Sequence, residues 1–146
     1  MFITLESDYA VRIIATLAAA NKKVDAKTIS EMAVVTLRFS LKILRKLVAS
    51  GLVKSYKGTL GGYMLAKKPE EITLKDVIEA IEGTYNFNRC LGDEYDCSRG
   101  MSGICCFQGA SSEISDMVRE KLESYNFKDL LERQAEINKK CPRRNK

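Results

Sequence analysis

TLRFSLKILRKLVASGLVKSYKGTLGGYMLA, residues 36–66, joins a helical pattern to two short runs of strand-forming residues. Leucine or valine recurs at positions 37, 41, 44 and 48 behind a threonine suited to an N-cap, and Gly51 ends the pattern. The opposite face of this helix collects Arg38, Phe39, Lys42 and Lys46, with Arg45 at its edge. The runs LVKSYK and YMLA flank GTLGG and predict a β-hairpin with a glycine-rich tip.

Two further helical patterns precede this stretch. Residues 7–20 place apolar side chains at helical spacing behind a cap at Ser7 or Asp8, and residues 25–33 begin with another cap residue. Two helices followed by a basic third helix and a hairpin are the order of a winged helix. In that fold the third helix lies in the major groove of DNA, and the hairpin tip, here Lys57 and Gly58, reaches the minor groove.

The charge of the chain is unevenly distributed. Residues 1–68 contain 12 Lys and Arg against 4 Asp and Glu, whereas residues 69–146 contain 12 against 15. Between Met32 and Pro69 there are eight basic residues and no acidic one. Solvated surfaces usually mix both signs, so this stretch is predicted to face an anion, which for a winged helix is double-stranded DNA.

Composition narrows the class of protein further. The chain has 146 residues, 45% of them hydrophobic, which suffices for one domain with a core and an appendage. Its N-terminus lacks the basic segment of a secretory signal, and its apolar run is interrupted by charges, so we expect a cytoplasmic protein with no membrane association. There is no histidine, which excludes Ser-His-Asp and Cys-His catalysis and any metal site that needs an imidazole.

The second half of the sequence predicts a helix, a long loop and another helix. Residues 73–82 form a helical pattern that starts at a Thr73 cap, and residues 110–125 carry an apolar stripe. The stripe consists of Ile114, Met117 or Val118, and Leu122. Little of the chain remains to cover it, so a second copy is the simplest partner and a homodimer is predicted. The tail should begin as a helix and end in basic residues that fray around Cys141.

The predicted fold is therefore mostly α with a small β-hairpin wing. We expect a winged helix-turn-helix DNA-binding domain at residues 1–83 and a cysteine-rich loop at 84–109. Residues 110–146 should form a long dimerisation helix and the C-terminal tail.

Three stretches of the sequence resemble one known family. They are ITLESDYAVRIIATLA (3–18), ISEMAVVTLRFSLKILRKLVASGLV (29–53) and YKGTLGGYMLAKKPEEITLKDVIEAIEG (56–83), and the wing pattern GLVKSYKGTLGGYML is the most specific element. With the cysteine loop and the helix after it, they are similar to the Rrf-type winged-helix regulators, which include IscR-like and NsrR-like iron-sulfur proteins. The resemblance implies a dimeric transcription factor, and not an enzyme, whose cysteine loop binds an iron-sulfur cluster.

The resemblance also implies which residues contact DNA. They are Thr36, Arg38, Phe39, Leu41 and Lys42 on the recognition helix, and Lys57 and Gly58 on the wing. Two of them depart from the family pattern, since Lys57 stands where many members have Arg, and Leu41 where some have a polar residue that reads a base. These departures bear on which DNA sequence is recognised.

Four of the five cysteines lie within residues 90–106. In a reducing compartment such a group indicates a metal site, a catalytic thiol or a redox switch in preference to structural disulfides. Cys90, Cys97 and Cys105 are separated by six and seven residues, a spacing that suits a larger cluster better than zinc. Together with the resemblance, this favours an iron-sulfur cluster, 2Fe-2S or 4Fe-4S, on these three residues. Cys106 is adjacent to Cys105, and alignment of the following helix with the family favours Cys105 of the two as the ligand. A metal-free thiol or disulfide regulator and an electron-transfer protein are the alternatives.

Three cysteines leave one position of a cluster open. In the IscR-like branch a histidine three residues after the third cysteine fills it, but this chain has Gln108 there. In the NsrR-like branch an aspartate near the N-terminus of the partner subunit fills it, and the start ITLESD places Asp8 at the matching position. A carboxylate at that point can instead cap the first helix. The resemblance favours Asp8 as the fourth ligand and predicts that Gln108→Ala leaves the cluster unchanged.

Overall fold

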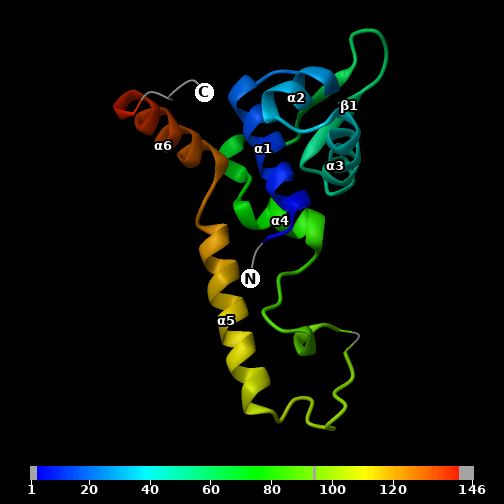
Figure 1. Cartoon of the computed structure of the whole chain (residues 1–146), viewed down its shortest axis with the longest axis vertical. Coiled ribbons are helices and arrows are strands. Elements are labelled where there is room, and N and C mark those ends of the chain that lie inside the picture. Colours follow the sequence, from blue (N-terminus) through cyan, green and yellow to red (C-terminus); the bar gives the residue numbers. More distant parts are fainter. Residues whose placement is uncertain (1–2, 94, 142–146) are drawn as a thin grey trace.

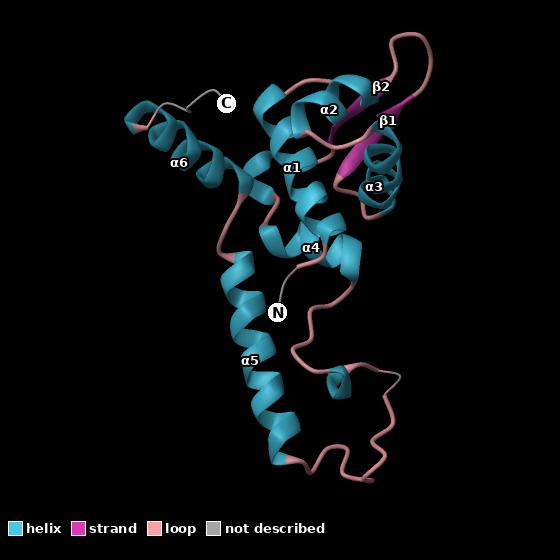
Figure 2. Cartoon of the chain, in the orientation of Figure 1, coloured by secondary structure: helices cyan, strands magenta, loops and turns pink. Residues whose placement is uncertain are grey.

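The computed structural model describes residues 3–93 and 95–141, so the basic residues that follow Cys141 lie outside the described part. In chain order its elements are α1 (Leu5–Ala20), α2 (Ala26–Ala33), α3 (Leu37–Ala49), β1 (Val53–Tyr56), β2 (Gly62–Leu65), the 3-10 helix η1 (Pro69–Glu71), α4 (Leu74–Glu82), the 3-10 helix η2 (Arg89–Leu91), α5 (Cys106–Glu123) and α6 (Phe127–Lys140). Figure 1 shows a compact body of α1 to α4 with the hairpin, from which α5 extends. Strands occur in the hairpin, and the other regular elements of the described chain are helical (Figure 2). None of the helices in these ranges is long and apolar enough to span a membrane.

The first three helices confirm the predicted helix-turn-helix. The Asp25 side chain accepts a hydrogen bond from the Thr28 amide at 3.0 Å, and α2 begins directly after this cap. The Thr36 hydroxyl accepts one from the Phe39 amide at 3.4 Å, and α3 begins after it. Such caps satisfy amides that have no partner within the helix, so both helices start where the sequence predicted.

The first helix begins earlier than predicted, because its N-cap is Thr4 and neither Ser7 nor Asp8. The Thr4 hydroxyl accepts a hydrogen bond from the Ser7 amide at 3.2 Å. Glu82, the last residue of α4, accepts further hydrogen bonds from the Thr4 amide at 3.0 Å and from the buried Ser7 hydroxyl. The residues that start α1 are thus also held by a carboxylate from far along the chain, which the local sequence does not indicate.

The core lies where α1, α2, α3, α4 and β1 meet. The buried side chains of α3 are those of Ser40, Ile43, Leu44 and Leu47. This face is rotated from the predicted leucine stripe, and Leu37 is exposed while Leu41 is half-buried. Both faces carry apolar residues at helical spacing, so the periodicity of α3 alone did not decide between them.

The wing hairpin pairs β1 with β2 in antiparallel register, with Tyr56 opposite Gly62. The connector between α1 and α2 adds a bridge to it, because the Val24 amide donates to the Tyr63 carbonyl at 2.9 Å and the Tyr63 amide donates to the Val24 carbonyl at 2.8 Å. A Cβ atom on Gly62 would lie 2.7 Å from the Val24 carbonyl oxygen, so this approach requires glycine. The bridge holds the wing against the helix-turn-helix.

The second half of the chain differs from the prediction at two places. α5 begins at Cys106 and not at residue 110, so the cysteine loop is shorter and its last two cysteines lie at the start of a helix. The tail helix α6 returns to the body, where Phe127 is 2% exposed and its amide donates to the Ile72 carbonyl at 3.0 Å. The three-part division of the chain stays a prediction, but its third part contributes a residue to the core of the first.

Candidate DNA-binding face and cysteine loop

The outer face of α3 displays the residues that were predicted to contact DNA. A shallow hollow on this face is lined by Leu37, Arg38, Phe39, Leu41, Lys42 and Arg45. Thr36 is also exposed, but its hydroxyl is engaged in capping the helix. Lys57 and Gly58 are exposed at the tip of the wing, whose strands lie next to α3 (Figure 1). The seven residues therefore lie on two adjacent parts of the fold, the start and outer face of α3 and the wing.

Glu6 of α1 lies against this face, a contact that the sequence analysis missed. Its two carboxylate oxygens lie 3.2 Å from the Lys42 Nζ and 2.9 Å from the Lys46 Nζ. The Lys46 ammonium, followed by that of Lys42, lowers the pKa of Glu6 against the opposing effect of burial. Tyr9, one turn further along α1, packs edge to face on Phe39 with ring centroids 6.1 Å apart. α1 thus both supports the recognition helix and neutralises part of its charge.

Replacing Glu6 with glutamine should strengthen DNA binding about two- to fivefold per subunit at low salt, the scale of a partly exposed ion pair. The substitution keeps the shape of the side chain and removes the charge that competes with DNA phosphates for Lys42 and Lys46. Fluorescence anisotropy with a labelled operator measures the change. Glu132→Gln in α6 removes the same charge far along the chain and should have no effect; weaker binding by the Glu6 variant would mean that Glu6 positions the lysines.

The cysteine loop follows α4 and runs beside α5 before it reaches the start of that helix (Figure 1). Cys90 lies in η2, Cys97 in a turn and Cys105 at the N-cap position of α5, and all three are half-buried. All five cysteines are free, and Cys106 and Cys141 are exposed. Among the described residues, no group of three or more Cys, Asp or Glu side chains is arranged to hold a metal ion. The structure therefore places the predicted ligands on one loop without gathering them around a common point.

Cys97 has the environment of a thiolate ligand. Backbone N–H groups of Met101, and then of Arg99, hydrogen-bond to its sulfur and lower the pKa of the thiol. The Gly100 amide donates to the Cys97 carbonyl at 2.7 Å, which closes the turn around the residue. Peptide N–H groups directed at a sulfur stabilise the deprotonated form that metals and clusters require. The donor set of the loop fits a thiolate-bound group.

Asp8 lies in α1 and takes no part in capping it. Its carboxylate Oδ2 pairs with the Arg12 Nη2 at 2.7 Å, and both side chains are partly exposed. The amide of Asp8 donates to the Thr4 carbonyl within the helix at 3.0 Å. The structure of one chain does not bring Asp8 together with the three cysteines, and the capping role considered for it belongs to Thr4.

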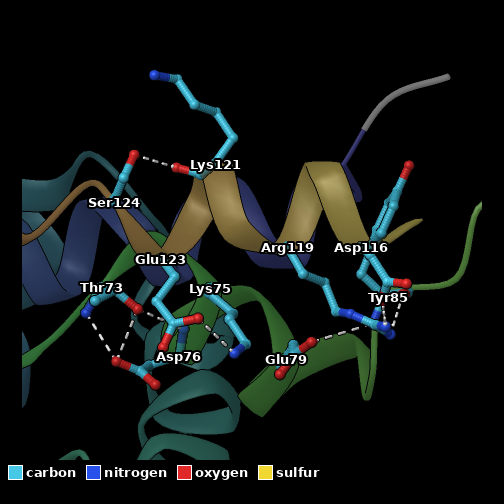
Figure 3. Close-up of polar contacts among 10 residues, drawn as sticks. All are labelled: Thr73, Lys75, Asp76, Glu79, Tyr85, Asp116, Arg119, Lys121, Glu123 and Ser124. Atoms are coloured by element: carbon cyan, nitrogen blue, oxygen red, sulfur yellow. Dashed lines mark hydrogen bonds and ion pairs between the residues drawn. The ribbon is translucent and has the colours of Figure 1, made fainter. Parts of the chain in front are cut away.

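Polar contacts tie the start of the loop to α5 and α4, as Figure 3 shows. The Arg119 Nη1 of α5 donates to the Tyr85 carbonyl at 3.2 Å, and Arg119 also pairs with Asp116. Lys75 of α4 pairs with Glu123 of α5, with 3.0 Å between Nζ and Oε2. These contacts make α4, the first residues of the loop and the end of α5 one connected unit.

A second anchor of the loop is a pair of buried serines on α5. The Ser115 hydroxyl donates to the Ser111 carbonyl at 2.7 Å and accepts a hydrogen bond from the Phe87 amide at 2.9 Å. The side of α5 that faces its own chain is therefore polar. Its apolar residues Ile114 and Met117 point outward and are 38% and 68% exposed.

Comparison with known proteins agrees with this architecture. Residues 3–133 match the family model described as "Rrf2: Iron-dependent Transcriptional regulator". The chain is 28% identical over 142 residues to the HTH-type transcriptional regulator NsrR of Bacillus licheniformis, and the alignment covers 95% of this chain and 98% of NsrR.

Solved structures show the same fold. The T. potens IscR structure superimposes with a TM-score of 0.71 at 22% identity, and the superposition covers 99% of this chain and 94% of the IscR chain. CymR, the global cysteine regulator of B. subtilis, gives a TM-score of 0.67 at 25% identity, with coverage of 89% and 95%. The family predicted from the wing and helix-turn-helix motifs is confirmed, and the chain belongs to the Rrf2 family of transcriptional regulators.

Proposed function

We propose that the protein is a homodimeric, non-enzymatic DNA-binding regulator that senses iron-sulfur status, redox state or nitric oxide through a cluster on its cysteine loop. The observation that carries this proposal is the position of the loop. It begins at the end of α4, whose last residue, Glu82, accepts a hydrogen bond from the N-cap residue of the helix that supports the recognition helix. It ends at α5, which is tied back to α4 by the Lys75–Glu123 ion pair. A change in the order of the loop would therefore act on both the DNA-binding body and α5.

The proposed DNA contacts are Thr36, Arg38, Phe39, Leu41, Lys42, Lys57 and Gly58. Arg38 and Lys57 are exposed cations on the two elements that a winged helix inserts into DNA grooves. Thr36 is the least suited to reading a base with its hydroxyl, since that oxygen already accepts the Phe39 amide. Its place at the start of α3 suits a backbone contact to phosphate.

The proposed dimer contact is the apolar side of α5. Met117 and Val118, with Lys121 and Ser124, line a shallow hollow on this helix. An exposed Met117 next to a groove is the kind of surface that a second copy of the same helix covers in an isologous interface. Two copies would present two recognition helices to two related half-sites on DNA.

The proposed cluster ligands are Cys90, Cys97 and Cys105, with the partner subunit's Asp8 in the fourth position. An iron-sulfur cluster supplies a centre that reacts with oxidants and nitric oxide. The chain itself supplies the thiols, the N–H groups that stabilise Cys97 as a thiolate, and the contacts that hold the loop on α5. The similarity to NsrR and IscR supports a cluster.

A metal-free thiol regulator is the second candidate. Cys106 and Cys141 are exposed free thiols outside the proposed ligand set. The chain is also similar to CymR, the global cysteine regulator of B. subtilis. Anaerobic purification followed by an absorption spectrum and by iron, sulfide and zinc analysis separates the two candidates. Iron and sulfide in equal amounts, with operator affinity that differs between cluster-loaded and cluster-free protein, are expected. Protein without iron whose DNA affinity responds to oxidants would identify the thiol regulator.

Asp8→Ala should change the spectrum or shorten the lifetime of the cluster while the fold stays intact. The Asp8–Arg12 pair is exposed, so its loss should cost at most about 1 kcal/mol of stability. The matched control is Arg12→Ala, which removes the same ion pair and leaves the carboxylate. If both variants, or neither, alter the spectrum and the reaction with nitric oxide, Asp8 is not a ligand and its contribution is limited to the pair.

A further inference from the structure

Gln108 occupies the first turn of α5 and uses both ends of its side-chain amide within the cysteine loop. Its Nε2 donates to the Cys90 carbonyl at 2.9 Å, and its Oε1 accepts a hydrogen bond from the Gly103 amide at 2.9 Å. The side chain is half-buried. One residue thus joins the beginning of the loop, the end of the loop and the helix that follows it.

The two backbone groups that Gln108 holds lie at the first cysteine and just before the third. Cys90 contributes its own carbonyl, and Gly103 lies two residues before Cys105. Gly103 has φ of +79°, a conformation that side-chain-bearing residues rarely adopt, so the local chain is shaped to present this amide. Cys97 lies between the two attachment points. The amide of Gln108 therefore limits how far the Cys90 backbone can move from the segment just before Cys105.

We propose that Gln108 is a positioning residue that closes the cysteine loop and keeps Cys90 near the segment that leads to Cys105, which favours the later assembly of a thiolate-bound cluster. The effect on a cluster rests on the proposed function, whereas the closure of the loop by Gln108 does not require a cluster. Closing a long loop in advance removes part of the entropy that ligation would otherwise lose. An amide that is engaged at both ends by backbone groups is a poor candidate for the fourth position of a cluster.

The chemistry of the clamp requires an amide. A glutamate at this position has the same length but no N–H donor, and its carboxylate would face the Cys90 carbonyl oxygen. An alanine removes both hydrogen bonds. The proposed clamp therefore predicts that Gln108→Ala shortens the lifetime of a cluster, where the sequence predicted no change.

The first test uses the protein without a cluster, so it does not depend on the proposed function. Gln108→Ala should raise the hydrogen-exchange rate of the Gly103 amide about tenfold or more, as measured by NMR, and Gln108→Glu, which keeps an acceptor for that amide but faces the Cys90 carbonyl with a carboxylate, should raise it less. Gln134→Glu is the matched control. Gln134 donates a hydrogen bond to Asn138 on α6, so this substitution makes the same chemical change outside the loop. Unchanged exchange at Gly103 in both Gln108 variants would overturn the clamp.

The second test measures the cluster. Loss of the cluster to a chelator should be several-fold faster in both Gln108 variants than in the wild type, with the same absorption spectrum at the start because the ligands are unchanged. A shifted starting spectrum would make Gln108 a ligand and overturn the inference, as would an unchanged rate of loss. If the wild type binds no cluster while the Gly103 amide still responds to the variants, the proposed function fails and the loop closure stands.

Discussion

Affinity for the operator should fall about 10³-fold or more as the salt concentration rises from about 50 to about 200 mM. The reason is the density of cations on the proposed face, where Arg38, Lys42 and Arg45 line one hollow and Lys57 lies on the adjacent wing. A dimer that placed about three to five such groups per subunit on phosphates would release a comparable number of counterions from each half-site. Anisotropy titrations across a salt series give the slope directly.

Single substitutions measure how much each cation contributes to this salt dependence. Lys57→Ala should weaken binding and lower the slope of log affinity against log salt by about one for each phosphate that the lysine neutralises. Arg38→Ala should do the same if Arg38 meets a phosphate, or relax the sequence preference if it meets a base. Lys128→Ala, an exposed cation of α6, serves as the control. Binding that is independent of salt, or equal losses of affinity for all three variants, would exclude this face as the DNA-binding surface.

The parts of the fold that could be predicted from sequence are those fixed by local chemistry. Asp25, Thr36 and Thr73 each accept an amide hydrogen bond from within their own helix, so the starts of α2, α3 and α4 follow from cap residues alone. The wing was equally local, since the GTLGG tip separates two strand-forming runs. These elements are also the ones that define the family, which is why the family was evident before the structure.

Contacts between distant residues could not be predicted in this way. Nothing near Glu6 indicates that it will meet two lysines of α3, and nothing near Ser7 indicates that Glu82 will hold it. The same holds for the side-chain amide of Gln108. The sequence indicates only that this amide is a poor ligand for iron, whereas in the structure it binds two backbone groups. In each case the tertiary fold supplies a polar side chain with a partner that its own sequence neighbours do not reveal.

The turn of the helix-turn-helix adds a conformational example. Val34 ends α2 with φ of +55° and is 78% exposed. Glycine and asparagine are the residues that favour this left-handed conformation, and a β-branched side chain is strained in it. Sequence preferences would therefore not place the turn at Val34, and it is the packing of α2 and α3 on the core that imposes it.

Phe127→Ala should lower the free energy of unfolding by about 3–5 kcal/mol, the cost of removing a fully buried aromatic ring. Phe127 is 2% exposed and belongs to the same core as the residues of α1 and α4. Its backbone is held as well, because its amide donates to the Ile72 carbonyl at 3.0 Å and the neighbouring Tyr125 carbonyl accepts from the Leu74 amide at 2.9 Å. Urea titration followed by circular dichroism measures the loss, and Ile137→Ala, at a 56% exposed position on the same helix, should cost about 0.5 kcal/mol or less.

This substitution also tests how α5 is held. The contact of Arg119 with the Tyr85 carbonyl holds the C-terminal part of α5, and Phe127 holds the chain just after this helix in the core. A helix fixed at several points to the DNA-binding body can transmit a change in its own position to that body, whereas a more loosely held helix would swing freely. Phe127→Ala should therefore also reduce the difference in operator affinity between cluster-loaded and cluster-free protein. A variant as stable as the wild type would mean that α6 does not pack on this core in solution, and α5 would then be held by its contacts with α4 and the loop without help from Phe127.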